Sequence, residues 1–394
     1  MTEIEMEKLL KPESPACLII KAKFKPIGGT DRFQPAGFPE IGHVLYDAPR
    51  GMNSTEKVCI VDSPASMANH LEAACMAGPE DFELHRDLKG LPYILCVTDR
   101  NMKQENGIII QDPNDPHDKV VLTSITEGHR IASDYFLDSV VNPRWEPERK
   151  AEKKGTKKIE TIPAQWTGQT FREKLREEFG ITEIQKNKTY FIHPEDWWSI
   201  YNTIFKYDPN SLVHGVLLAK EQIKISRFLT AHLEAFGAAR VGRSGMKYDP
   251  LGKTASGQPI FAVDEETANE IRGTFILDLA LLRSYGREDK GLNMVQKRLL
   301  LDLALWKVTR LITYPFRYRT QCHLMAYDIE MSTEKTAIGK SLPDLDIVRS
   351  IHECKFDSTP MTKVYYSASK LFKVGEEKEE STEEEEKTEE KPVD

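Results

Sequence analysis

The sequence predicts an α+β fold, because segments typical of strands and of helices follow one another in irregular order. The run CLIIKAKF at residues 17–24 is rich in apolar and β-branched residues, which is typical of a first core strand. Ser63 is placed as a helix N-cap with Pro64 at the first helical position, and apolar residues recur every four positions from Met67 to Cys75. With 394 residues and 40% hydrophobic content, the chain can bury a large core around such elements.

The other expected elements follow from local apolar patterns and turn residues. Helices are predicted at 169–179, with one apolar face, and at 221–236, ended by Gly237. The apolar segments 275–282 and 299–312 add to the core. Strands are predicted at 93–98, at 107–110 and 119–125 as a hairpin, at 212–219, and at 316–324 with one charged face.

We interpret residues 1–374 as a single body with insertions. The stretch 143–158 combines prolines with a run of charges and is expected to be an exposed linker. It is the first part of a helical subdomain expected to be inserted at about 143–195. A glycine-rich, basic excursion at 237–264 is expected to be long and exposed. Residues 375–394 are expected to be a disordered acidic tail, and we find no internal repeat.

The formal net charge of −8 comes from one end of the chain. Residues 375–394 contain 11 acidic residues and 3 lysines, so the other residues hold 51 basic and 51 acidic side chains. Because a neutral body has no broad basic face, composition alone leaves RNA binding as one interpretation among several. The tail is interpreted as solubilising, with mimicry of nucleic acid as the alternative.

No stretch approaches the roughly 20 apolar residues that a membrane-spanning helix needs, and residues 1–11 are too acidic for a signal peptide. A cytoplasmic location without membrane contact is therefore expected. The six cysteines are scattered, without a CxxC pair or the close spacing of a disulfide framework. We expect them to be reduced and mostly buried.

Motifs of catalysis and nucleotide binding fail on inspection. The string GKT at 252–254 ends like a phosphate-binding loop, but Lys247 stands where that loop needs its first glycine. The string GRSG at 242–245 is one residue short of a nucleophile elbow. The cysteine and histidine pairs at 322–323 and 352–354 do not by themselves build a tetrahedral metal site. We expect that the chain is not an enzyme and needs no metal or other cofactor.

Four polar or basic segments beside glycines or a helix start could instead hold an RNA chain: 25–37, 63–69, 126–133 and 240–253. Cations would meet phosphates, glycines would let the backbone approach, and an aromatic ring could stack on a base. Each segment also has a structural interpretation as a turn, a helix cap or an ion pair. The candidate RNA contacts are Lys25, Arg32, Gln34, Ser66, Asn69, His129, Arg130, Arg240, Arg243, Lys247 and Tyr248, with Arg227, Arg317 and Arg319 as weaker candidates.

Several strings resemble a known family. RFQPAGFPEIGHVLYDAP at 32–49, VDSPASMANHLEAA at 61–74, TSITEGHRIAS at 123–133 and FKYDPNSLVHGVLLA at 205–219 occur in this order. They are followed by ISRFLTAHLEAFGAARV at 225–241, LDLALLRSYG at 277–286 and FRYRTQCHL at 316–324. Over about residues 15–325, the chain resembles the CRISPR-associated RAMP backbone family, Cas-seven-like and GSU-type, of the type I-G effector, formerly called I-U.

The resemblance implies both a fold and a function. The fold would be an RRM-like, ferredoxin-like palm with large insertions that form fingers and a thumb-like hairpin, here assigned to Arg240–Asp264. The function would be that of a non-catalytic crRNA-binding backbone subunit of a type I CRISPR interference complex, Cascade. Several copies would stack head to tail along the guide spacer and present it for pairing with target DNA.

The same resemblance implies the partners. They would be the crRNA, target DNA through the guide, further copies of this chain and other Cascade subunits. Those subunits would include a fused Cas-five and Cas-six-like subunit and a large subunit. A separate helicase-nuclease would cut the target.

Two other functions stay open at this stage. A type III-like backbone subunit would cleave target RNA with the help of a metal, and Asp31 in its glycine-rich loop would be the residue to assist. Asp31 can equally be a turn residue paired with Arg32. A stand-alone metabolic α+β enzyme would form a small oligomer that purifies free of nucleic acid.

Overall fold

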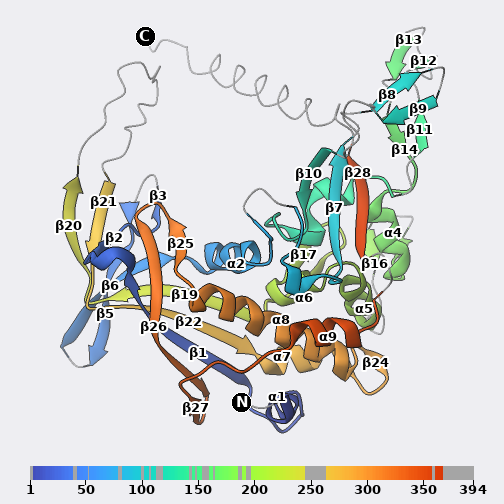
Figure 1. Ribbon diagram of the computed structural model, residues 1–394. Helices are drawn as coiled ribbons and strands as arrows, with labels where there is room; N and C mark the ends of the chain where they lie inside the picture. The colour runs from blue at the N-terminus through green and yellow to red at the C-terminus, as the bar shows by residue number, and fades with distance from the viewer. Residues whose placement is uncertain are drawn as a thin grey trace, which may run out of the picture. The chain divides into compact units, whose positions relative to one another are not determined.

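The computed structural model describes residues 3–38, 42–51, 53–78, 82–98, 102–105, 108–111, 119–141, 144–146, 149–152, 159–162, 165–184, 189–191, 197–244, 263–356 and 360–366. The chain forms two compact units (Figure 1). The first unit consists of Met1–Gly90, Leu212–Gly215 and Ile225–Phe356. The second unit consists of Leu91–Ser211, Val216–Lys224 and Asp357–Asp394.

The first unit is built on one antiparallel sheet. Its strands lie in the order β25, β26, β1, β22, β19, β6 and β5, and β27 also pairs with β26 (Figure 1). The bounds are β1 Cys17–Pro26, β5 Leu45–Gly51, β6 Ser54–Asp62, β19 Leu229–Phe236, β22 Glu270–Asp278, β25 Phe316–Arg319, β26 Cys322–Thr333 and β27 Ala337–Gly339.

Alternating burial along these strands forms the core. In β1, Leu18, Ile20, Ala22 and Phe24 are buried, while the residues between them keep some exposure. Because successive side chains of a strand point to opposite faces, one face of the sheet is apolar and enclosed. Each fully buried Leu or Ile contributes about 1.5–3 kcal/mol through removal of its apolar surface from water.

Helices complete the core of the first unit. Helices α2 and α8 contact each other, α2 packs on β19 and α8 on β26. Helix α8 buries 12 of its 20 residues, so it is enclosed over most of its circumference. The helices of this unit are α1 Glu3–Lys8, α2 Pro64–Ala73, α7 Leu279–Ser284, α8 Met294–Thr313 and α9 Ile347–Glu353.

The second unit has a smaller sheet and several hairpins. Strand β7 pairs with β10 antiparallel and with β28 in parallel. Buried Arg172 of α4 donates to Asp134 at 2.7 Å and to Glu221 at 3.5 Å, which ties α4 to two other segments. The main elements are β7 Tyr93–Thr98, β10 Lys119–Thr123, α3 Asp134–Leu137, α4 Phe171–Glu178, α5 Trp197–Tyr207 and β28 Met361–Tyr366.

Elements with strong local signals are confirmed. Strand β1 covers the predicted first strand, and α4 covers most of the helix predicted at 169–179. The Ser63 cap is also confirmed, because its hydroxyl oxygen accepts from the backbone N–H of Ser66 at 3.2 Å. Helix α8 occupies the apolar segment at 299–312.

The predictions at 212–219 and 221–236 are wrong. Helix α6, Pro209–His214, extends into the first predicted strand, of which only Val216–Leu218 forms a strand, β17. The predicted second helix is replaced by β18, Ile223–Ile225, and by β19. In LTAHLEAF every second residue is buried, and pairing with β6 and β22 overrides the helical propensity of its leucines and alanines.

Three further expectations are corrected. The expected single strand at 316–324 is a hairpin, because Gln321 turns the chain with a φ of 58° between β25 and β26. Residues 108–111 pair with 102–105 rather than with 119–125, which joins β7 instead. The expected linker at 143–158 contains β11, Arg144–Glu146, and β12, Arg149–Glu152, because these pair with β14, Gln165–Thr167, and β13, Ile159–Ile162.

Some expectations lie outside the described residues: the acidic tail at 375–394 and the excursion at 245–262, with Lys247 and Tyr248. The inserted subdomain proposed at about 143–195 lies within the second unit and holds hairpins as well as α4. Among the helices in the described part of the chain, none has the length and apolar character needed to cross a membrane.

Gly215, between α6 and β17, gives a test of the fold. It has a φ of +79°, and an added Cβ would lie 2.7 Å from the carbonyl oxygen of Ile225. We expect Gly215→Ala to lower the free energy of unfolding by more than the roughly 1–2 kcal/mol that a left-handed alanine costs. Gly28→Ala is the control, since Gly28 has a φ of +75° but open space around it. Equal losses in urea unfolding of the two variants would contradict the close approach.

Candidate nucleic-acid interface

A small three-stranded sheet forms the base of the excursion that the sequence singles out. Strands β20, Ala239–Ser244, and β21, Val263–Thr267, pair antiparallel, and β2, Arg32–Phe33, pairs with β21 on the other side. Phe33 is buried, and the hydroxyl of Thr267 donates to the carbonyl oxygen of Asp31 at 2.7 Å. The loop after β1 and the root of the excursion therefore form one structure, which we call the hairpin root.

Two adjacent carboxylates hold the hairpin root together. Glu265 lies 3.2 Å from Nε of Arg32. Fully buried Glu266 accepts from Nε of Arg240 at 3.1 Å and lies 3.1 Å from Nδ1 of His43. Because neighbouring residues of a strand point to opposite faces, the two pairs fasten the two faces of β21.

Burial also shapes the chemistry beside Glu266. Burial, with the nearby charge of Glu266, raises the pKa of the Cys59 thiol to about 12, although Arg240 acts in the opposite direction. This cysteine is therefore an un-ionised thiol at neutral pH, and its role is packing rather than nucleophilic attack.

The loop at 27–36 connects the hairpin root to two other places in the first unit. Gly28 and Gly29 both have a φ of +75°, which favours glycine, and an added Cβ at either position would meet nothing within 4 Å. The N–H of Gln34 donates to the carbonyl oxygen of Gln321 at 3.0 Å, and that of Ala36 donates to Val61 at 2.8 Å. The loop thus lies against the β25–β26 turn and the end of β6.

The start of α2 is fixed by a buried carboxylate. Asp62 interacts with Nε2 of His70 and with Nη2 of Arg319, each at 2.8 Å, and accepts from the N–H of Ser63 at 2.9 Å. Burial alone would raise the pKa of Asp62, but the hydrogen bond to His70 and the charge of Arg319 outweigh it, so the pKa lies below its usual value. Arg227 joins this region by donating to the carbonyl oxygen of Pro64 at 3.4 Å.

Most of the candidate RNA contacts lie in the first unit, but several are already paired. Arg32 and Arg240 face carboxylates, and Ser66 contributes its backbone to the helix cap. Lys25 is exposed, has its ammonium 5.9 Å from the centre of the Tyr327 ring, and has no carboxylate partner among the described residues. The candidates in this unit are Lys25, Arg32, Gln34, Ser66, Asn69, Arg227, Arg240 and Arg243, with Arg317 and Arg319.

Two candidates lie in the second unit. His129 is exposed, and its Nδ1 lies 2.8 Å from a carboxylate oxygen of Glu127. Arg130 is 5% exposed, has a φ of 56° and donates to the carbonyl oxygen of Gly128 at 3.1 Å. A buried guanidinium bound to its own loop is in a structural position, whereas His129 is accessible to solvent.

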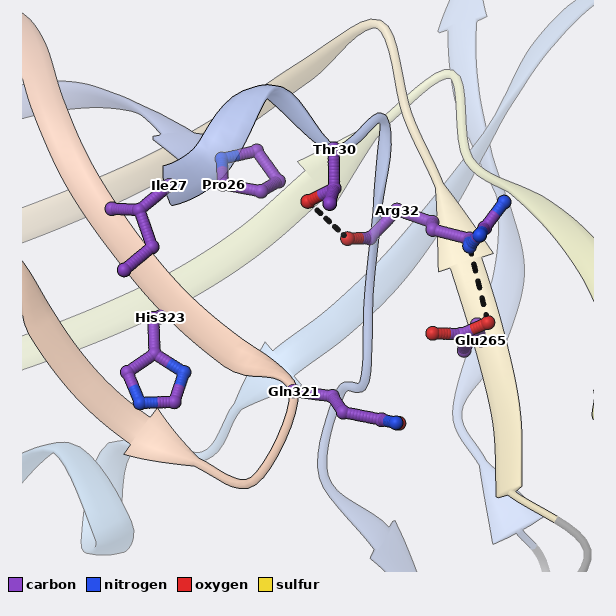
Figure 2. A pocket seen from close by; sticks show the side chains of 7 residues that line it. All are labelled: Pro26, Ile27, Thr30, Arg32, Glu265, Gln321 and His323. Atoms are coloured by element: carbon purple, nitrogen blue, oxygen red, sulfur yellow. Dashed lines mark hydrogen bonds and ion pairs between the residues drawn. The ribbon is translucent and has the colours of Figure 1, made fainter.

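A cleft opens beside the hairpin root (Figure 2). Its volume is about 290 Å³. Among the polar residues of the cleft, the sequence predicts only Arg32 as a contact, because Gln321 and His323 belong to the single strand predicted at 316–324 and Glu265 follows the excursion. The lining residues are Pro26, Ile27, Thr30, Arg32, Glu265, Gln321 and His323.

Comparison with known proteins identifies the family. A family model described as CRISPR-associated protein GSU0053 matches residues 18–240, more than half of the chain. The chain belongs to this family. The resemblance to a CRISPR-associated, GSU-type family is thereby confirmed. A search of curated proteins finds no match.

The GSU0053 match includes β1, the loop at 27–36, α2 and the first residues of β20, and so most of the candidate interface. It ends before Arg243, Lys247 and Tyr248. Within the part of this GSU0053-family chain that the structure describes, no group of three His, Cys, Asp or Glu side chains could hold a metal ion.

Asp62→Asn tests the anchor at the start of α2. Because the pKa of Asp62 is lowered in the folded state, its contribution is present above the unfolded-state pKa of about 4 and is lost as the pH falls through the folded-state pKa. We expect the variant to lose about 1–3 kcal/mol of unfolding free energy at pH near 7 and less in acid. The control Glu56→Gln removes an exposed pair with Arg50 and should cost about 0–1 kcal/mol. A pH-independent loss for Asp62→Asn in denaturant titrations would contradict the role of its charge.

Proposed function

We propose that this chain is a non-catalytic crRNA-binding backbone subunit of a type I-G Cascade complex. The observation that carries the proposal is the gathering of distant family segments in the first unit. The loop at 27–36, the start of α2 and the hairpin root are linked by hydrogen bonds and ion pairs, although they are far apart in the sequence. Glycines with open space around them and exposed cations therefore lie near one another in the first unit.

The sheet topology supports an RRM-like palm. In space β26, β1, β22 and β19 are neighbours, α2 lies in the connection from β1 to β19, and α8 lies in the connection from β22 to β26. This is the connectivity of a ferredoxin-like βαββαβ unit. Strands β5 and β6 extend it beyond β19.

The hairpin root supports the assignment of a thumb to Arg240–Asp264. Strands β20 and β21 are antiparallel and flank the excursion, so they have the geometry of the two arms of a hairpin. Glu265 and Glu266 fix these arms to β2 and to His43. The hairpin root would thereby hold both ends of the proposed thumb in place.

The proposed subunit binds the guide RNA through the sugar-phosphate backbone of the RNA. Phosphate contacts tolerate any sequence and leave base edges free for pairing with target DNA. Copies of the chain would stack head to tail on the spacer, and the neutral body outside the tail would limit repulsion between them. The fused Cas-five and Cas-six-like subunit, the large subunit and a helicase-nuclease would complete a cytoplasmic complex in which this chain does no cutting.

Co-expression with a matching CRISPR array and the neighbouring effector genes tests the function directly. We expect size exclusion to yield a multimeric particle, and sequencing of its RNA to return spacer-derived molecules of one length. Co-expression with an array of unrelated spacers is the control, and the bound sequences should change with the array. A small oligomer free of nucleic acid would contradict the proposal and favour a metabolic enzyme. Cleavage of target RNA that is lost in Asp31→Ala would favour the type III-like alternative.

Lys25→Ala tests the phosphate contacts. Lys25 lacks a carboxylate partner among the described residues, so its charge is available to RNA without first breaking an ion pair. We expect weaker binding of single-stranded RNA and a fall of roughly one in the slope of log K against log salt. The control Arg287→Ala removes an exposed cation from the β23–β24 hairpin, Gly286–Gly291, and should leave both quantities unchanged. Equal effects of the two variants in fluorescence anisotropy titrations would indicate unspecific attraction only.

A further inference from the structure

Four planar side chains form a chain of contacts at the C-terminal end of α8. The centre of the His85 ring lies 5.4 Å from the centre of the Trp306 ring. The guanidinium carbon of Arg310 lies 5.8 Å from the centre of the Trp306 ring and 5.3 Å from that of Tyr314. Trp306 is only 6% exposed, whereas Tyr314 is 57% exposed. We call these four residues, which all belong to the first unit, the Arg310 stack.

The two rings hold the guanidinium of Arg310 without using its hydrogen-bond donors. Trp306, Arg310 and Tyr314 follow one another at four-residue intervals, so they lie along one side of α8 and its C-terminal end. Contacts with ring faces orient the guanidinium plane and leave the N–H groups at its edge available. Among the described residues, Arg310 has no carboxylate partner and no hydrogen bond.

Arg310 also carries the positive charge of the stack that is not offset. Burial lowers the pKa of His85, and the charges of Arg310 and Arg86 act in the same direction against Asp87, so the ring is neutral at neutral pH. The carboxylate of Asp87 lies 3.4 Å from Nδ1 of His85 and 3.5 Å from Nε of Arg86. Asp87 and Arg86 therefore balance each other, and Arg310 is left to attract an anion.

A single oriented guanidinium suits a carboxylate better than a nucleic-acid strand. Its planar fork can donate two parallel hydrogen bonds to the two oxygens of one carboxylate. A nucleic-acid strand presents a row of phosphates and gains its affinity from several cations, but only one charge remains here. Trp, Tyr and Arg are also the residues most enriched among those that dominate the energy of protein interfaces. The stack therefore fits an acidic peptide segment.

The chain itself contains such a segment. Residues 375–394 hold ten glutamates and Asp394 against three lysines, so their charge is complementary to that of Arg310. Tyr366 is the last residue that the structure describes, and the run of glutamates at 383–386 begins 17 positions later. An extended chain of that length spans up to roughly 60 Å. A ligand on the same chain also acts at a high effective concentration.

We propose that Arg310, fixed between Trp306 and Tyr314, binds a glutamate of the acidic segment 375–394 of the same chain. The guanidinium forms a charge-assisted pair with the carboxylate, and the methylene groups of the glutamate lie against the exposed ring of Tyr314. Because the pair is near the surface, salt weakens it. The inference does not depend on RNA binding, and it gives the acidic segment a defined contact on the first unit.

Photo-cross-linking in the full chain tests the contact. Thr313 is the last residue of α8, is exposed and lies three positions after Arg310, so p-benzoylphenylalanine in its place probes the same side of the helix and leaves the stack intact. We expect mass spectrometry to find cross-links from this position to residues 375–394. Their yield should fall as the salt concentration rises.

Variants assign the cross-links to the stack. Arg310→Ala should lower the yield by roughly tenfold, the effect of losing a hydrogen bond to a charged group. Arg310→Lys keeps the charge but loses the planar fork, so it should also lose most of the yield. Replacement of the ten glutamates of 375–394 by glutamine should do the same without touching α8. Arg287→Ala is the control, because it removes an exposed cation that pairs with Glu288, and it should keep the full yield.

Several results would overturn the inference. Wild-type yields in Arg310→Lys or in the glutamine variant would indicate unspecific attraction only. Cross-links to co-purified RNA in place of residues 375–394 would assign the stack to nucleic acid. In an equal mixture of isotope-labelled and unlabelled chains, cross-linked peptides that combine the two labels would identify a second copy as the occupant. None of these outcomes decides whether the chain binds a guide RNA.

Discussion

The pairing of β1 with β22 on one side and β26 on the other is the constraint on which the first unit depends. It covers residues 17–24 on the β22 edge and residues 18–26 on the β26 edge, and it holds Ile20 opposite Phe275 and Met331. A shift of one residue would turn the buried residues of β1 to the other face, so this register is strongly specified. Because the loop at 27–36 leaves directly from the end of β1, the same register sets where that loop meets Gln321 and the hairpin root.

Two neighbouring carboxylates, Glu265 and Glu266, stabilise the hairpin root to different degrees. In the Arg32–Glu265 pair the Arg32 side chain is 48% exposed, so solvent screens the interaction and the pair contributes little to stability, about 0–1 kcal/mol for pairs near the surface. Glu266 differs because it is fully buried between Arg240 and His43, and removing one partner of a buried pair leaves a charge without compensation. Glu266 therefore fixes the geometry of the hairpin root, whereas Glu265 adds an ion pair with Arg32 of β2.

The sequence predicts the elements whose signals are local. The β-branched run of β1, the Ser63 and Pro64 helix start and the apolar face of α4 act within a few residues, and all three are confirmed. The local sequence of β19 predicts a helix because its leucines and alanines suit both structures, and only pairing with β6 and β22 decides for a strand. The candidate site likewise combines local signals with distant contacts. The glycines of the loop at 27–36 predict the loop itself, but its partners Glu265 and Gln321 come from segments far along the chain and cannot be predicted from local sequence.

These partners change what the cations of the site can do. From the sequence, Arg32 and Lys25 are equivalent phosphate contacts in one basic loop. In the structure, Lys25 keeps its charge free of carboxylates among the described residues, while Arg32 shares its charge with Glu265. A cation without a carboxylate partner can meet a phosphate directly, whereas Arg32 would first have to give up Glu265. Two cations only seven positions apart, Lys25 in β1 and Arg32 in β2, therefore differ in how readily they can meet an anion.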